Sequence, residues 1–216
     1  MDTCVIFCAG KFDRLLQPIR STDLVIAADG GLRHLSQLGI MPDIILGDFD
    51  SLGYTPEGAQ VYPVEKDDTD SMLALRHGLQ RSYRRFVLYG SLDGPRLDHT
   101  IANLQSLLFL AEHRAEGFLV GTRYIAAVLT NGSFAFPETA TGILSVFCMD
   151  GIADGVTLSG LKYSLEDGQL SSRFPLGVSN HFIGQPATVS VKRGSLILLY
   201  DRCNSFPVKE GIHADL

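Results

Sequence analysis

The chain has 216 residues, of which 45% are hydrophobic and 19% are charged, and its formal net charge is -6. This composition is typical of a well-packed soluble protein and excludes a disordered one. The acidic balance argues against nucleic-acid binding and membrane-surface binding, and no apolar run approaches the ~20 residues that span a bilayer.

The N-terminus lacks the basic region of a signal peptide, and no CxxC pair occurs among the cysteines Cys4, Cys8, Cys148 and Cys203. We therefore expect reduced thiols and a cytoplasmic location. The six histidines are scattered without metal-ligand spacing, which argues against a zinc site.

Short apolar runs alternate with helical patterns over roughly the first 115 residues. The expected strands cover residues 4–9, 24–28, 44–46, 61–64 and 86–89. The expected helices are a short one through residues 12–16, one through residues 32–38 that ends at Gly39, and two longer ones over residues 68–81 and 98–112. This alternation predicts a mainly parallel sheet with helices on both faces.

Strand patterns dominate after about residue 117. The expected strands cover residues 124–129, 133–136, 143–149, 156–161, 187–192 and 195–200. Asn131-Gly132, Asp167-Gly168 and Arg193-Gly194 predict hairpin turns. The prediction is therefore an α/β domain over residues 1–117, followed over residues 118–216 by an all-β domain of sandwich or barrel type.

Acidic residues follow four of the predicted strands of the first domain. The four strand-to-helix junctions are AADGG at 27–31, LGDFDSL at 46–52, EKDDTDS at 65–71 and YGSLDGPRLDHTIAN at 89–103. Ligands of an open α/β sheet bind where its strands end, so these junctions predict the functional site. Asp68 and Asp98 also stand where their helices should begin, so helix N-capping is an alternative role for both.

Asp48 and Asp50 flank Phe49 directly after a buried strand. On an extended segment, both carboxylates would point to one side and Phe49 to the other. Neighbouring carboxylates repel unless a cation neutralises them, and hard oxygen ligands favour Mg²⁺ or Mn²⁺ over zinc. Protein-bound Mg²⁺ is commonly completed by substrate phosphates, and Lys66 and Arg96 would supply the positive charge that a triphosphate needs.

The chain contains neither a GxxxxGK[ST] loop nor a GxGxxG sequence after the first strand. Phosphoryl-group transfer by positioning and charge neutralisation fits the acidic site, because it needs no protein nucleophile. Two alternatives are a glycosyltransferase, whose DxD would hold Mn²⁺ and a sugar nucleotide, and a non-catalytic module that senses ATP.

In order and spacing, four segments resemble the thiamine pyrophosphokinase family: ADGG at 28–31, PDIILGDFDSL at 42–52, YPVEKDDTDSMLAL at 62–75 and RLDHTIANL at 96–104. Segments 160–165, 179–182 and 187–198 resemble its second domain. The resemblance implies transfer of the pyrophosphoryl group of ATP to thiamine, giving thiamine diphosphate and AMP. It also implies an α/β domain followed by a β-sandwich, in a homodimer whose active sites lie between the α/β domain of one subunit and the β domain of the other.

The resemblance also implies roles for individual residues. Asp48, Asp50 and Asp70 match carboxylates that bind magnesium and phosphate. Asp29, Gly30 and Gly31 match a segment that lines the ATP cleft. Lys66, Thr69, Arg96 and His99 match residues that approach the phosphates. Asp98 matches a functionally important aspartate that acts as a base or orients a substrate, and Ser179 and Asn180 match a loop that contacts thiamine.

The sequence departs from the family pattern at two places. The lead into the arginine motif, GSLDGPR at 90–96, carries Asp93, Pro95 and one extra residue, where many members have a shorter Gly-Gly-Arg turn. Members often stack thiamine on a tryptophan of the β domain, whereas this chain has none, and Phe174 and Phe182 are the alternatives for that role.

Overall fold

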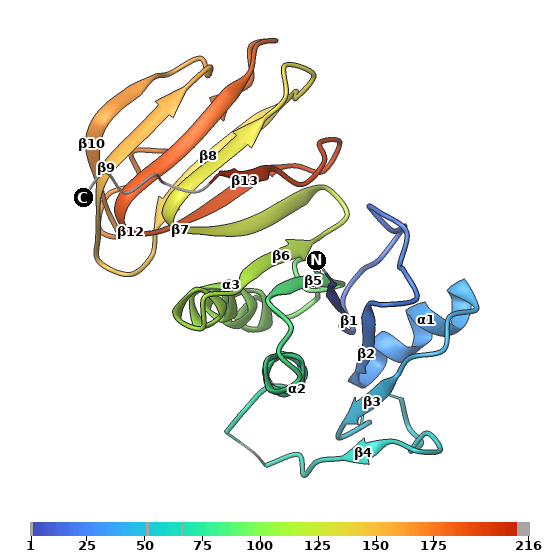
Figure 1. The fold of residues 1–216 in the computed structure, drawn as a ribbon. Coiled ribbons are helices and arrows are strands. Elements are labelled where there is room, and N and C mark those ends of the chain that lie inside the picture. The colour runs from blue at the N-terminus through green and yellow to red at the C-terminus, as the bar shows by residue number, and fades with distance from the viewer. Residues whose placement is uncertain (1, 51, 66, 211–216) are drawn as a thin grey trace. The chain divides into compact units, whose positions relative to one another are not determined.

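A computed structural model describes residues 2–50, 52–65 and 67–210 of the chain (Figure 1). The fold is mixed α/β, and the chain divides into two compact units, Met1–Thr122 and Arg123–Leu216. The division falls after Thr122 and not after residue 117, because residues 116–120 form a strand that pairs in parallel with the sheet of the first unit. Among the described residues, no helix is both long and apolar enough to cross a bilayer.

The described residues of the first unit form six strands. They are β1 (Cys4–Phe7), β2 (Leu24–Ala28), β3 (Ile44–Gly47), β4 (Gln60–Val61), β5 (Arg85–Tyr89) and β6 (Glu116–Val120), in the spatial order β6-β5-β1-β2-β3-β4. Every adjacent pair in this series is parallel, as predicted. The residues of β1 and β2 are all buried, which explains why both strands are continuous apolar runs with no polar alternation.

The helices of the first unit are η1 (Asp29–Gly31), α1 (Leu32–Leu38), α2 (Asp70–Gln80) and α3 (Leu97–Glu112). In Figure 1, α1 lies on one side of the parallel strands and α2 and α3 lie on the other. Gly39 follows α1 in the left-handed conformation (φ 67°), which confirms the predicted helix end. Buried Leu35, Leu75 and Leu110 anchor the three α-helices in the core.

The helix predicted through residues 12–16 is wrong, because residues 11–20 contain neither helix nor strand. The Phe12 ring instead meets Phe7 and Tyr89 edge-on, with centroid distances of 5.5 and 5.6 Å. Phe12, which suggested a helical stripe, therefore packs on core aromatic rings from a segment without regular secondary structure.

The alternative role of Asp68 and Asp98 as helix N-caps is not observed. Thr69 caps α2, with its hydroxyl oxygen accepting from the Met72 N–H at 3.2 Å. Asp68 pairs instead with Arg76 at 2.9 Å, and Asp98 lies in the first turn of α3, after Arg96 at the cap.

A buried carboxylate ties the start of the chain to the sheet. Asp23 accepts hydrogen bonds from the Thr3 N–H at 2.9 Å, the Arg20 N–H at 2.9 Å and the Arg20 guanidinium at 2.8 Å. Burial alone would raise the pKa of Asp23, but these hydrogen bonds outweigh burial and lower the pKa.

We expect Asp23→Ala to lower the free energy of unfolding by about 3 kcal/mol, because buried donors lose their acceptor. A folded-state pKa below the unfolded value makes Asp23 stabilising above about pH 4, and this stability is lost as the pH falls through the folded pKa. Urea unfolding should therefore show Asp23→Ala and Asp23→Asn to be less stable than the wild type at pH 7, and the stabilities of Asp23→Asn and the wild type should converge in acid. Equal stabilities at pH 7 would contradict this account.

The second unit is antiparallel throughout its described strands. They are β7 (Tyr124–Phe136), β8 (Ile143–Cys148), β9 (Ile152–Ser159), β10 (Leu165–Ser171), β11 (Asn180–His181), β12 (Ala187–Asp201) and β13 (Val208–Glu210). Strand β12 pairs with β7 along its length, with β9 in its first half and with β8 in its second half. The arrangement of this network as a sandwich stays a prediction.

The three predicted hairpin turns are wrong for one physical reason. Asn131 (φ 43°), Asp167 (φ 46°) and Gly194 (φ 107°) do have the left-handed backbone that such sequences favour. They lie, however, inside the long strands β7, β10 and β12, and the registers of β10 with β9 and of β12 with β7 shift at these places. The Asn131 side chain accepts from the Gly194 N–H at 3.0 Å, so two of the three sites face each other across one irregularity.

Candidate active site

Three carboxylates meet where β2 and β3 end. One oxygen from each of Asp29, Asp48 and Asp50 lies within 4.8 Å of the others, and this is the one such acidic group among the residues that the structure describes. Asp29 follows β2 directly, and Asp48 follows β3 directly. Because β2 and β3 are parallel neighbours, with Ala28 opposite Leu46, their carboxyl ends bring the three side chains together.

The backbone between Asp48 and Asp50 is a turn and not the predicted extended segment. Phe49 is buried and has a φ of 60°, and its carbonyl accepts from the N–H groups of Leu52 and Gly53, both at 3.2 Å. The Asp50 N–H donates to the Asp48 carboxylate at 3.3 Å. The turn buries the phenyl ring and still leaves both carboxylates on one side, so the predicted convergence holds by a different geometry.

Two positions near Asp29 are glycines because other backbone segments approach them too closely for a Cβ atom. A Cβ at Gly31 would lie 1.9 Å from the carbonyl oxygen of Phe7, and a Cβ at Gly47 would lie 3.0 Å from the Cα of Asp29. Gly47 also has a φ of 149°, which favours glycine. Gly30 and Gly31 are both buried in η1, so this segment presents Asp29 from a closely packed support.

Asp70 is the first residue of α2, where a negative charge is favoured by the helix dipole. Burial, and second the charge of Asp70, raise the pKa of the Cys8 thiol to about 12. Asp70 is outside the group formed by Asp29, Asp48 and Asp50. Its assignment as a metal ligand stays a prediction, whereas Asp29 is a candidate ligand that the sequence analysis placed only in the ATP cleft.

Arg96 and Asp98 form an exposed ion pair at the start of α3, with 2.6 Å between the guanidinium nitrogen and the carboxylate oxygen. The hydrogen bond from Arg96 holds the pKa of Asp98 below its usual range. Asp98 is therefore ionised at neutral pH. His99 follows in the same turn and is also exposed.

Asp93 anchors the longer loop before Arg96. Its carboxylate accepts from the Thr122 N–H, and its carbonyl accepts from the Lys11 N–H at 3.1 Å. The loop begins close to the end of β1, with the Gly10 N–H donating to the Gly90 carbonyl at 2.9 Å. The additional residue is thus tied to the body of the first unit.

In the second unit, the two residues predicted to contact thiamine, Ser179 and Asn180, lie in different environments. Asn180 is buried, and its amide oxygen accepts from the N–H groups of Tyr163 and His181, both at 2.9 Å. Its amide nitrogen donates to the Tyr163 carbonyl at 2.6 Å. The Asn180 side chain therefore holds the neighbouring segment, and Ser179, which is exposed and has a φ of 61°, is free to face solvent.

The two phenylalanines considered as replacements for tryptophan lie in different environments. Phe182 is buried against Phe136, with a centroid distance of 5.2 Å, and belongs to the core. Phe174 is 66% exposed, and Tyr163, held by Asn180, is 58% exposed. Of the two phenylalanines, only Phe174 offers its ring to a ligand.

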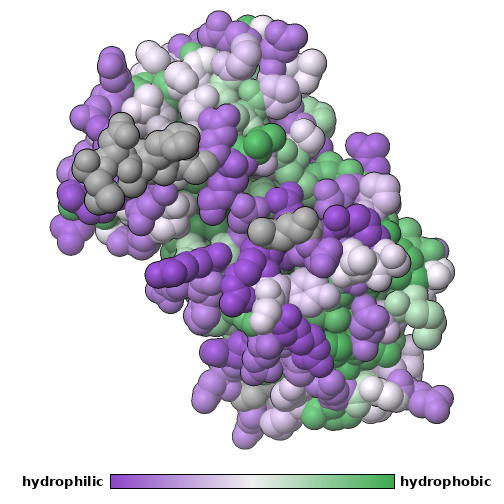
Figure 2. Space-filling model, in the orientation of Figure 1, coloured by the Kyte–Doolittle hydropathy of each residue, from purple (hydrophilic) through white to green (hydrophobic). Residues whose placement is uncertain are grey.

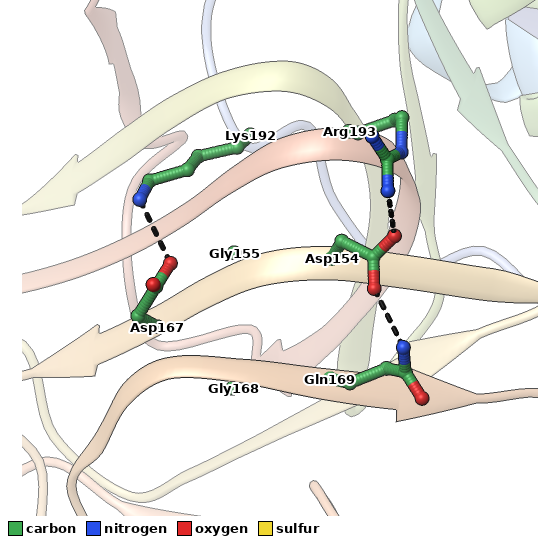
Figure 3. A pocket seen from close by; sticks show the side chains of 7 residues that line it. All are labelled: Asp154, Gly155, Asp167, Gly168, Gln169, Lys192 and Arg193. Atoms are coloured by element: carbon green, nitrogen blue, oxygen red, sulfur yellow. Dashed lines mark hydrogen bonds and ion pairs between the residues drawn. The ribbon is translucent and has the colours of Figure 1, made fainter.

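A shallow hollow on β9, β10 and β12 is lined by charged side chains, as Figure 3 shows. Lys192 pairs with Asp167 at 2.8 Å, and Arg193 pairs with Asp154 at 2.5 Å. These charges neutralise one another, so we assign no ligand to the hollow.

Lys66, predicted to approach the phosphates, lies outside the described residues. Thr69, predicted to do the same, directs its hydroxyl oxygen to the Met72 N–H as a helix cap.

Two family models match the chain. The catalytic domain of thiamin pyrophosphokinase matches residues 15–119, and the vitamin B1 binding domain of thiamin pyrophosphokinase matches residues 135–196. A thiamine pyrophosphokinase from Bacillus subtilis (strain 168) is 27% identical over 185 residues, which cover 82% of this chain and 86% of that protein.

Solved structures give the same result. Thiamine pyrophosphokinase from Bacillus subtilis has a TM-score of 0.80 at 26% identity, covering 93% of this chain and 99% of its own. The enzyme from Geobacillus thermodenitrificans has a TM-score of 0.75 at 26% identity, covering 93% and 97%. The enzyme from Candida albicans, with a TM-score of 0.69 at 17% identity over 93% and 88%, shares the fold.

Proposed function

Because the chain belongs to the thiamin pyrophosphokinase family, we propose that it transfers the pyrophosphoryl group of ATP to thiamine, giving thiamine diphosphate and AMP. The observation that carries the proposal within the structure is the convergence of Asp29, Asp48 and Asp50 at neighbouring strand ends. An ATP–metal complex is the ligand that such a group of carboxylates suits.

The donor set fits Mg²⁺. All three groups offer carboxylate oxygen, the ligand type that Mg²⁺ prefers, and neither histidine nor cysteine belongs to the group. Asp29, Asp48 and Asp50 would hold the ion, with Asp70 as a further ligand or a second contact to the phosphates. When bound, Mg²⁺ supplies charge neutralisation and electrophilic polarisation of the phosphates.

The side chains of the first unit supply the rest of the chemistry. Arg96 and Lys66 would offset the negative charge of the triphosphate, His99 would donate a hydrogen bond to it, and the N-terminus of α2 at Thr69 would add its dipole. The hydroxyl oxygen of thiamine bonds to the β-phosphorus of ATP while the bond from that phosphorus to the α–β bridging oxygen breaks, which releases AMP. Asp98 would orient the hydroxyl, because its lowered pKa makes the carboxylate a weak proton acceptor.

We place thiamine at the second unit of a partner subunit, in a cytoplasmic homodimer. In support, Phe174, Leu176 and Val178 are large apolar side chains that are exposed just before Ser179. Their segment is fixed against β8, because the Val146 N–H donates to the Gly177 carbonyl at 2.8 Å. The face drawn in Figure 2 mixes hydrophilic and hydrophobic residues. Light scattering coupled to size-exclusion chromatography should give a molar mass twice that of one chain.

We expect Asn180→Ala to raise the KM for thiamine ~10-fold and to change kcat less, because the segment that it holds loses a buried clamp. Steady-state kinetics with thiamine varied at saturating ATP measures this effect. Asn204→Ala is the matched control, since Asn204 clamps Thr141 by equivalent bonds of 2.8 and 2.9 Å. If Asn180→Ala left the KM for thiamine unchanged, Asn180 would have no role in the thiamine site.

Incubation of the purified protein with ATP, Mg²⁺ and thiamine tests the proposed function. Chromatography should show thiamine diphosphate and AMP appearing together. Folded protein that forms neither, or that turns over a sugar nucleotide instead, would overturn the assignment.

A further inference from the structure

We propose that Asn103 is a positioning residue for this reaction. Its buried amide fixes the N-terminus of α2, which carries Asp70, relative to the loop between β5 and α3 that leads to Arg96 and Asp98. The inference rests on the proposed function only for its kinetic consequence, because the contacts themselves lie within the first unit.

Asn103 lies on α3, is 6% exposed and makes two hydrogen bonds to segments far from it in the sequence. Its amide oxygen accepts from the Ser71 hydroxyl at 2.8 Å. Its amide nitrogen donates to the Ser91 carbonyl at 2.8 Å. One side chain therefore joins α2, the loop after β5, and α3.

The connection continues on the side of α2. The Ser71 hydroxyl lies 3.0 Å from the Thr69 hydroxyl, which caps α2 by accepting from the Met72 N–H at 3.2 Å. Asp70 lies between these two hydroxyl residues in the sequence. The position of its backbone is therefore fixed by the same hydrogen bonds that reach Asn103.

The connection also continues on the side of the loop. The Ser91 hydroxyl donates to the Leu88 carbonyl at 2.9 Å, and the Thr100 hydroxyl donates to the Leu92 carbonyl at 3.0 Å. The first residues of the loop are thus held to β5 and to α3. Together with Asn103, these bonds fix where the loop departs toward Arg96.

The chemistry of the two partners requires an amide at this position. The Ser91 carbonyl can only accept, so the Asn103 nitrogen must face it, and the oxygen is left to accept from Ser71. Aspartate lacks the donor, and leucine, which has a similar volume, lacks both the donor and the acceptor. Asparagine is the residue of this size that satisfies both sides in a buried site.

The kinetic consequence follows from the geometry of group transfer. Asp70 and Asp98 are proposed to act on one ATP–thiamine pair, but they belong to different segments. A displacement of ~1 Å between catalytic groups can lower a rate ~10²-fold, while binding of ATP through other contacts changes less. Loss of the Asn103 bridge should therefore reduce kcat more than it raises KM.

The test compares Asn103→Leu, Ser71→Ala and the double variant. We expect Asn103→Leu to lower kcat at least ~10-fold with the KM for ATP within ~3-fold, and the double variant to be no slower than Asn103→Leu. Ser106→Ala is the matched control, because its buried hydroxyl donates at 2.7 Å to the carbonyl of Asn103, so that this hydrogen bond stays within α3. Multiplying effects in the double variant, or a loss of kcat in Asn103→Leu no greater than in the control, would overturn the proposal.

Hydrogen exchange gives a second readout that does not depend on turnover. Removing the Ser71 hydroxyl on α2 should speed amide exchange in residues 91–96, which lie on the other side of Asn103. Unchanged exchange there would overturn the positioning role even in an active enzyme. If the wild type makes no thiamine diphosphate, the proposed function fails, and the exchange result alone still decides whether Asn103 couples the two segments.

Discussion

Asp48→Asn is expected to lower kcat/KM for ATP by ~10²-fold or more, and part of this loss should return as Mg²⁺ is raised. The substitution keeps the volume and one oxygen of the side chain but removes a charge from the group formed with Asp29 and Asp50. Loss of one group that stabilises transition-state charge commonly costs ~10²–10³ in rate. A weakened metal site is refilled by mass action, so steady-state rates measured over a wide range of Mg²⁺ concentration should show the recovery.

Asp13→Asn is the control for this prediction. Asp13 is exposed in the first unit and lies outside the acidic group, so its replacement removes the same charge without changing that group. Its kinetics should match the wild type. An Asp48→Asn enzyme with wild-type kcat/KM, or one whose defect is the same at every Mg²⁺ concentration, would exclude Asp48 as a metal ligand.

Asp98→Asn is expected to lower kcat by ~10²-fold without recovery at high Mg²⁺. The carboxylate is paired with Arg96 at 2.6 Å and is assigned to the substrate hydroxyl and not to the metal. Because the hydrogen bond from Arg96 lowers its pKa, Asp98 should remain ionised down to below the ~4 of an ordinary aspartate. The acid limb of the wild-type kcat profile should therefore not come from Asp98 between pH 5 and pH 8.

The pH profile separates orientation from general-base catalysis. An acid limb near pH 6–7 in the wild type that disappears in Asp98→Asn would show that Asp98 titrates in this range and acts as a base. Glu112→Gln is the control for charge, since Glu112 is an exposed acid at the opposite end of the same helix. It should leave both kcat and the profile unchanged.

The parallel sheet of the first unit could be predicted because the side chains of its strands are buried, and buried strands have a recognisable sequence pattern. Strands such as β1 and β2 are continuous apolar runs, and a run of this kind has few alternatives to a strand buried on both faces. The acidic strand ends could be predicted for the same reason, since Asp29 and Asp48 directly follow buried strands. The sequence pattern could not predict which of the carboxylates lie close together. That depends on the pairing of β2 with β3 and on the left-handed turn at Phe49.

The errors in the second unit have a local cause. A sequence such as Asn131-Gly132 favours a left-handed backbone, and both a hairpin turn and a strand irregularity use that backbone. Only the pairing partner decides between them, and here β12 continues past the site. Asn180 was assigned to the thiamine site through the family resemblance alone, and the sequence could not show that its side chain also bonds to Tyr163 of the same chain.

Phosphorus NMR of the reaction mixture is the most direct test of the account. With ATP, thiamine and Mg²⁺, the spectrum should gain AMP and thiamine diphosphate in equal amounts as ATP disappears, and these changes should stop when the metal is chelated. Formation of ADP together with thiamine monophosphate, or no change in the presence of folded protein, would contradict transfer of a pyrophosphoryl group at the site formed by Asp29, Asp48 and Asp50.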